Sequence, residues 1–268
     1  MNVEDFLNDI KETKSKSTFK EYKHGINKFA DWFGKTPNEI LEMRKQDWVS
    51  DDLHQKKRFM RELEKFHSYL IKQEYSINSA RTLCLGIMQL FRFYEMPITI
   101  PSGSEVSKTV VSTKDYVPTS EQYREMFKVS SDLRAKLIIS LGKDLGWRIG
   151  DFVKIKKEQV PNLEQEPPIL FELITEKEDV LAKSFISSES AELLKEYLLT
   201  LTTKNPYLFP SNTENYIDPD TINRTLKDLA EKSNIHIPQN KRLRFHAFRK
   251  RFISTCANLG IDVNIAKI

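Results

Sequence analysis

Three side chains in the second half of the sequence have the types and spacing to bind one phosphate group. Arg148 lies in the segment 146–151, and His246 and Arg249 lie three residues apart in the segment 245–251. Cations aimed at the oxygens of a phosphodiester lower the barrier to attack, because the transition state adds negative charge there. A histidine beside them can carry a proton near neutral pH. The two arginines are roughly a hundred positions apart, so only tertiary folding can bring them together.

A lysine could supply the proton that a leaving oxygen needs. The stretches 169–174 and 180–186 are rich in strand-forming residues and flank the charged segment 175–179, which predicts a hairpin. Lys177 at its tip could reach into a DNA groove and protonate a leaving oxygen, and Lys183 within the second strand is the alternative. An equally good interpretation makes Lys177 a solvated residue of a charged turn.

Each of these residues also has an ordinary structural explanation. Arg148 could form a structural ion pair with Asp144 or Asp151, and His246 could be a hydrogen-bonded core histidine. Their combination favours chemistry over structure. The segment 241–251 holds six basic residues and no acid, which favours a polyanionic partner.

The composition predicts a globular protein of two domains without a membrane span. Of 268 residues, 39% are hydrophobic and 30% charged, and the net charge is only +4. Cys84 and Cys256 fall on apolar helical stripes, so we expect buried free thiols in a reducing compartment. The N-terminus lacks an export signal, and no apolar run approaches the ~20 residues that span a bilayer. We therefore expect a cytoplasmic protein.

Periodicity predicts a mainly α fold with a small antiparallel β-sheet. Residues 1–96 read as a helical domain, with an aromatic stripe over 19–33 and a second helix over 53–74. Residues 97–117 are rich in Pro, Gly, Ser and Thr and predict a linker. Residues 118–268 form the second domain, in which a helix over 132–144 ends at a glycine and places Arg148 on a bend between two helices.

The motifs resemble those of a known family. GWRIGD at 146–151 resembles the first arginine motif of the tyrosine recombinases, the phage integrase family, and HAFR at 246–249 resembles their His-x-x-Arg box. The order of elements is also similar: helical domain, linker, arginine turn, three-stranded sheet with a lysine hairpin, and His-x-x-Arg helix. The continuation RKRF at 249–252 is closer to archaeal members.

This resemblance implies a fold and an activity. It implies a helical (SAM-like) core-binding domain over 1–96, which contacts DNA, and an α+β catalytic domain from 118 to 268. It also implies site-specific recombination or integration of double-stranded DNA by transesterification through a 3′-phosphotyrosine, without metal or nucleotide cofactor. The active species would be a homo-tetramer on paired DNA sites, associated with the nucleoid. By position, Arg148 and Arg249 would hold the phosphate, with His246 assisting and Lys177 as general acid.

The sequence departs from the family pattern in several places. Leu145 and Asp151 replace the usual threonine and glutamate, and Lys250 stands where many members have a second histidine. No tyrosine follows Arg249, and the last one, Tyr216, precedes the motif. We therefore expect a chain truncated in its catalytic domain, which binds DNA and polarises a phosphate without cleaving it. The alternative is a regulatory DNA-binding protein with a recombinase fold; a type IB topoisomerase uses similar groups but is usually longer.

Overall fold

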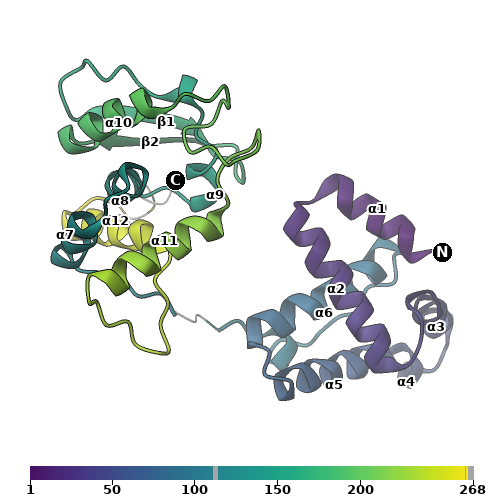
Figure 1. The fold of residues 1–268 in the computed structure, drawn as a ribbon. Coiled ribbons are helices and arrows are strands. Elements are labelled where there is room, and N and C mark those ends of the chain that lie inside the picture. The colour runs from purple at the N-terminus through teal and green to yellow at the C-terminus, as the bar shows by residue number, and fades with distance from the viewer. Residues whose placement is uncertain (111–113, 263, 265–268) are drawn as a thin grey trace. The chain divides into compact units, whose positions relative to one another are not determined.

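The structure, a computed structural model, describes all residues except 111–113, 263 and 265–268. It divides into two compact units, Met1–Ser112 and Thr113–Ile268. Figure 1 shows the elements of each unit. The expected linker, 97–117, contains this division, but Ile98 and Val106 are buried in the core of the first unit. The first half of that segment therefore packs as part of the N-terminal unit.

The N-terminal unit is helical. Its elements are α1 (Val3–Thr13), α2 (Lys16–Phe33), α3 (Pro37–Val49), α4 (Leu53–Lys56), α5 (Arg58–Lys72), α6 (Ile77–Phe93) and a 3-10 turn, η1 (Glu105–Ser107). Aromatic rings fill the core, among them Phe29 against Phe66 and Phe59 against Phe91, each pair with centroids 5.2 Å apart. The aromatic stripe predicted over 19–33 thus lies on α2 and faces the core.

Two features of this unit differ from the prediction. The helix expected over 53–74 is divided at Lys57 into α4 and α5. Helix α3 has no apolar periodicity because two of its buried residues are charged, Arg44 and Asp47. Arg44 donates to the carbonyl oxygens of Lys56, Met96 and Pro97, at 3.0, 3.1 and 2.7 Å. Because charged residues with hydrogen-bond partners occupy buried positions of α3, the helix lacks the apolar periodicity that usually predicts one.

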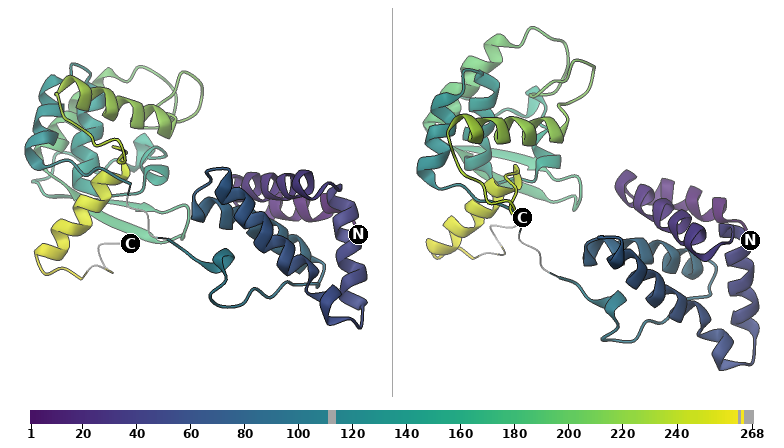
Figure 2. Two further views of the ribbon diagram at one scale, coloured as in Figure 1. Left: turned by 90° about the horizontal axis from the view of Figure 1, so that it is seen from below. Right: turned by 60° about the horizontal axis from the view of Figure 1, so that its bottom comes forward.

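The C-terminal unit is built around one helix, α8. Its elements are α7 (Ser120–Val129), α8 (Leu133–Leu145), α9 (Ile149–Phe152), η2 (Lys157–Gln159), β1 (Ile169–Ile174), β2 (Leu181–Ile186), α10 (Ser188–Thr200), α11 (Pro219–Lys232) and α12 (His246–Asn258). Helix α8 lies between the hairpin and α10 on one side and α7, α11 and α12 on the other (Figure 1). The C-terminal end of α12 projects from the unit (Figure 2).

The sheet positions the hairpin that holds Lys177. Strands β1 and β2 are antiparallel, with Ile169 opposite Ile186 and Glu172 opposite Lys183. Alternate residues of both strands are buried, so one face packs on the helices. The mainly α fold with a small antiparallel sheet is confirmed, although the described residues form two strands where the resemblance implied three.

The cysteine prediction was correct for one residue. Cys84 is buried in α6, and burial raises the pKa of its thiol to about 12. Cys256 is only half-buried, because it lies in the part of α12 that projects from the unit. The expectation of a buried thiol was therefore wrong for Cys256.

The close crossing of α2 and α6 generates a stability prediction. A Cβ on Gly25 would lie 2.4 Å from the carbonyl oxygen of Leu83, a backbone atom that no rotamer change can move. We expect Gly25→Ala to lower the free energy of unfolding by about 1–3 kcal/mol, the usual range for overpacking. Urea unfolding followed by circular dichroism measures this. Asn27→Ala, at an exposed position of the same helix, is the control and should change stability by less than about 0.5 kcal/mol; equal effects would contradict the prediction.

Candidate functional site

The turn between α8 and α9 holds Arg148. Helix α8 ends where Gly146 adopts a left-handed backbone (φ 60°), which residues with a Cβ rarely adopt. Trp147 is buried edge-on against Phe171 of β1, with ring centroids 5.1 Å apart, and this contact fixes the turn to the sheet. Arg148 is the N-cap of α9 but makes no capping hydrogen bond with its side chain. Its guanidinium is therefore available to other groups.

Arg249 meets this turn from α12. Its side chain is almost completely buried, and Nη1 donates to the carbonyl oxygen of Gly146 at 2.9 Å. Phe252 also abuts the turn, since a Cβ on Gly146 would lie 2.5 Å from its Cγ. Burial lowers the pKa of Arg249, and the positive charge of Arg148 lowers it further. The structure thus brings the two arginines together, as the sequence suggested.

His246 is the first residue of α12 and completes the cluster. Its side chain is accessible, but partial burial lowers the pKa of the imidazole. The negative charge of Asp115 raises this pKa. Three cations act in the opposite direction, namely Lys250, Arg249 and Arg148. His246 therefore lies in a positively charged environment, where a neutral imidazole is favoured until an anion arrives.

The chain that enters the C-terminal unit is bound to the residues before and within α12. Asp115 forms an ion pair with Lys250 at 2.7 Å. It also lies in a parallel bridge in which Arg242 donates its N–H to the carbonyl of Lys114 at 2.6 Å and Tyr116 donates to the carbonyl of Arg242 at 2.9 Å. The sequence analysis missed Asp115, because a lone aspartate in a polar linker shows no pattern.

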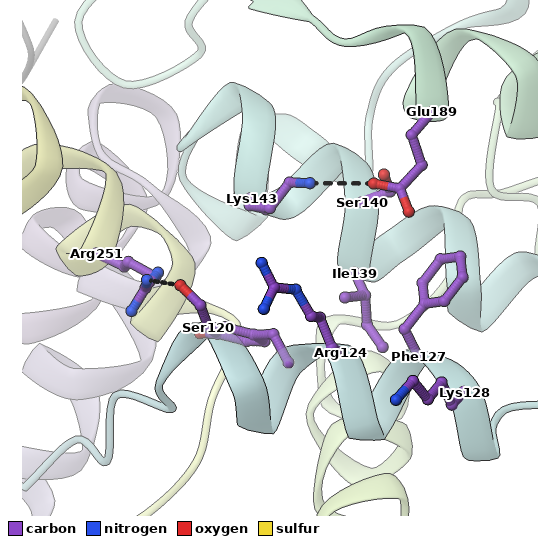
Figure 3. Close-up of a pocket in the computed structure, with 10 residues that line it drawn as sticks. Ser120, Arg124, Phe127, Lys128, Ile139, Ser140, Lys143, Glu189 and Arg251 are labelled. Carbon is purple, nitrogen blue, oxygen red and sulfur yellow. Dashed lines mark hydrogen bonds and ion pairs between the residues drawn. The ribbon is translucent and has the colours of Figure 1, made fainter.

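Arg251 holds the other side of α12. It donates to the carbonyl oxygen of Pro118 at 3.2 Å and to the hydroxyl of Ser120, the contact drawn in Figure 3. Its guanidinium also lies over the ring of Tyr123, 5.9 Å from the centroid. Arg251, Ser120 and Tyr123 are among the residues that line a cavity of about 460 Å³ between α7, α8, α10 and α12 (Figure 3). Arg148, His246 and Arg249 are not among its lining residues, so this cavity is separate from the cation cluster.

The hairpin tip reaches the arginine turn through its glutamates. Glu178 accepts from Nη2 of Arg148 at 2.9 Å. Glu176 pairs with Lys154, and its backbone N–H donates to the buried carboxylate of Asp151 at 3.0 Å. Lys177, between these two glutamates, is exposed and makes no hydrogen bond or ion pair with a described residue. Asp151 therefore holds the hairpin rather than orienting Arg148 directly.

Lys183, the alternative to Lys177, is engaged elsewhere. It forms an ion pair at 2.8 Å with Glu172, its cross-strand neighbour. Lys183 and Arg249 both line a cavity of about 430 Å³ between β2, the C-terminal end of α8 and α12. Both lysines are therefore near enough to the cluster to remain candidates for the general acid. Lys177 is adjacent in sequence to Glu178, which contacts Arg148.

Neither of the two expected ion-pair partners of Arg148, Asp144 and Asp151, is its partner in the structure. Asp144 accepts from the backbone N–H of Ser187 at 2.8 Å and from two hydroxyls, and so caps α10. Arg148 pairs instead with Glu178, which the sequence offered only as part of a charged turn. Tyr216, the last tyrosine, lies in a loop with its ring edge-on to Tyr207.

A second group of basic residues lies beside the cluster. A hollow of about 1070 Å³ separates α11 from the segment that precedes α12. Five of its lining residues are lysines or arginines: Arg224, Lys227, Lys241, Arg242 and Arg244. The basic run predicted at 241–251 thus divides between this hollow and α12.

The described residues contain neither a metal-binding cluster nor a helix that could span a membrane. Among them, no three His, Cys, Asp or Glu side chains lie close enough together to hold a metal ion. Within the same part of the chain, no helix has the length and apolar character needed to cross a bilayer.

Comparison with known proteins finds one matching family and a related protein. The sequence model of the phage integrase family matches residues 117–267. Tyrosine recombinase XerA of Pyrococcus horikoshii is 24% identical over 260 residues, which cover 95% of this chain and 78% of that protein.

Solved structures with the same fold include recombinases bound to DNA. A lambda integrase (75–356) dimer bound to a COC′ core site has a TM-score of 0.67 and 14% identity, over 99% of this chain and 93% of that one. XerH site-specific recombinase in a post-cleavage complex with palindromic difH has a TM-score of 0.62 and 16% identity, over 93% and 74%. At such identities the likeness concerns the fold alone.

The surroundings of His246 generate a prediction about its titration. Asp115→Asn removes the negative charge that raises the pKa of His246 and leaves Lys250 without its carboxylate partner, so the pKa should fall further below the ordinary value. NMR titration of the imidazole protons, with His246→Gln to assign the signal, measures this. Asp115→Glu keeps the charge and should titrate close to the wild type. An unchanged or raised pKa in Asp115→Asn would contradict the assignment.

Proposed function

The chain belongs to the phage integrase family, the tyrosine recombinases, and on that premise we propose that Arg148 and Arg249 bind the phosphodiester at which DNA strands are exchanged. The observation that supports this most is the hydrogen bond from Arg249 to Gly146, which fixes α12 beside the turn of Arg148. Two guanidinium groups from distant parts of the chain then lie together at one turn. The two positive charges repel each other, and an anionic substrate bound between them offsets this repulsion.

Each remaining residue has a role in the proposed reaction. A tyrosine hydroxyl releases its proton to water as its oxygen attacks the phosphorus, the bond from phosphorus to the 5′ oxygen breaks, and a 3′-phosphotyrosine forms. The leaving 5′ oxygen takes a proton, for which we propose Lys177, with Lys183 as the alternative. His246 donates to a phosphate oxygen as charge develops on it. The 5′ hydroxyl of a partner duplex then attacks the phosphotyrosine, so that the energy of the broken bond is retained.

The partner in this proposal is double-stranded DNA. The basic hollow beside α11 supports it, since cations at a protein surface bind the phosphate backbone without reading sequence. A lambda integrase tetramer bound to a Holliday junction shares this fold, with a TM-score of 0.65 at 15% identity over 99% of this chain and 76% of that one. We propose that four copies of this chain assemble on paired DNA sites, in the cytoplasm with the nucleoid.

Removing either arginine should weaken DNA binding in a defined way. We expect Arg148→Ala to raise the Kd for duplex DNA and to lower the slope of log K against log salt by about one phosphate contact. Arg249→Lys, which keeps the charge but loses the two-pronged geometry, should also weaken binding. Fluorescence anisotropy measures the Kd at several salt concentrations between about 50 and 200 mM, the range over which such slopes are determined.

The matched control for this experiment is Arg134→Ala. Arg134 is a half-exposed arginine near the other end of α8, roughly 17 Å along the helix from the turn. Its removal lowers the net charge equally but takes away no proposed phosphate ligand. Equal losses for Arg134→Ala and Arg148→Ala would mean that only overall charge matters, and the proposed site would be wrong.

A covalent adduct separates cleavage from binding alone. A nicked suicide duplex traps a phosphotyrosine intermediate, which survives denaturing electrophoresis. The 268-residue chain has no tyrosine after Tyr216, so we expect it to bind the duplex reversibly and form no adduct. An adduct would support recombination by this chain, with one of its own tyrosines as the nucleophile. Tight binding without an adduct would support the alternative, a regulatory DNA-binding protein with a recombinase fold.

A further inference from the structure

The proposed phosphate site already contains an anion from the chain itself. The carboxylate of Glu178 lies 2.9 Å from Nη2 of Arg148. Its negative charge also raises the pKa of Arg249, so it acts on both guanidinium groups. A carboxylate beside two arginines occupies the kind of position that a phosphate oxygen would take.

Glu178 differs from its neighbour Glu176 in what it touches. Glu176 pairs with Lys154 and is held through its backbone by Asp151. Glu178 pairs with Arg148 and is half-exposed, with 44% of its side chain accessible. Two acids two residues apart in one hairpin thus have separate partners, one outside the arginine cluster and one within it.

We propose that Glu178 is a specificity-determining residue of this site, because a ligand must displace its carboxylate to reach Arg148. The proposal rests on the proposed function of Arg148 and Arg249 as phosphate ligands. An anion that contacts Arg148 alone would replace the Glu178–Arg148 ion pair by another of similar strength, so its net binding free energy would be small. A DNA phosphodiester that engages both arginines forms more charge-assisted hydrogen bonds than it breaks. Glu178 therefore favours phosphates of a bound duplex over isolated anions.

The displacement needs little rearrangement. The hairpin remains fixed by the Glu176 N–H to Asp151 and by the Glu176–Lys154 pair. Only the side chain of Glu178 has to rotate away. Exposed ion pairs of this kind shift an equilibrium by about 1.5- to 5-fold. The effect on DNA affinity should fall in the same range.

The decisive experiment compares two variants with the same change in charge. Glu178→Gln keeps the size of the side chain but removes its charge, and Glu176→Gln does the same two residues away. The probe is duplex DNA, titrated by fluorescence anisotropy at fixed salt. We expect Glu178→Gln to bind about 2- to 5-fold more tightly than the wild type. The gain in affinity for Glu176→Gln should be less than half of that for Glu178→Gln, since the partner that it releases is Lys154 and not an arginine of the cluster.

A double-mutant cycle identifies the partner. In an Arg148→Ala background the guanidinium that Glu178 occupies is gone, so Glu178→Gln should give no more than the gain of Glu176→Gln. The proposal is overturned if the two glutamine variants gain equally in the wild-type background, or if the full gain of Glu178→Gln persists without Arg148. Thermal unfolding of each variant shows whether a change in folding contributes.

The experiments distinguish a failure of the phosphate site from a failure of the role of Glu178. If Arg148→Ala binds as tightly as the wild type, the proposed phosphate site is wrong. If Arg148→Ala weakens binding but Glu178→Gln and Glu176→Gln behave alike, the phosphate site stands and only the role of Glu178 is lost.

Discussion

The site depends on a buried arginine that donates to a helix-terminal carbonyl. Burying a guanidinium is expensive unless its donors find acceptors, since the group stays charged. Gly146 supplies one acceptor because α8 ends there and its carbonyl has no helical partner. The left-handed backbone of Gly146 then turns the chain so that Arg148 follows within two residues. This hydrogen bond gives one donor of Arg249 an acceptor and holds the residue beside the turn of Arg148.

This bond would fix little if α12 could move. Two adjacent residues of α12, Lys250 and Arg251, bind the chain that enters the unit, at Asp115 and at Pro118 and Ser120. Arg249 bonds α8 on another side of the helix. Residues that are consecutive in sequence point in different directions around a helix, so a run of three cations can hold three surfaces. The basic run at 249–251 therefore has a structural role beside any role in binding a polyanion.

The sequence predicted the parts of this site that follow from local rules. A glycine after an apolar helical stripe predicted the bend at Arg148, and stretches of strand-forming residues on both sides of a charged turn predicted strands within a residue of β1 and β2. Helix α3 was missed because Arg44 and Asp47 take the place of apolar residues in it. Asp115 and Glu178 were missed for another reason. Their partners lie far away in the sequence, and an ion pair between distant segments leaves no periodic signal in either.

Three carboxylates balance the cation cluster, and their burial assigns them different roles. Asp151 is 7% exposed and fixed to the backbone of Glu176, so it cannot leave without disrupting the hairpin. The Asp115 side chain is 18% exposed and held by Lys250, and its backbone is part of a bridge. Only Glu178 combines a contact to an arginine of the cluster with a side chain that is half in solvent. Because water can replace its contacts at small cost, Glu178 is the one carboxylate of the three that a phosphate can displace while the fold stays intact.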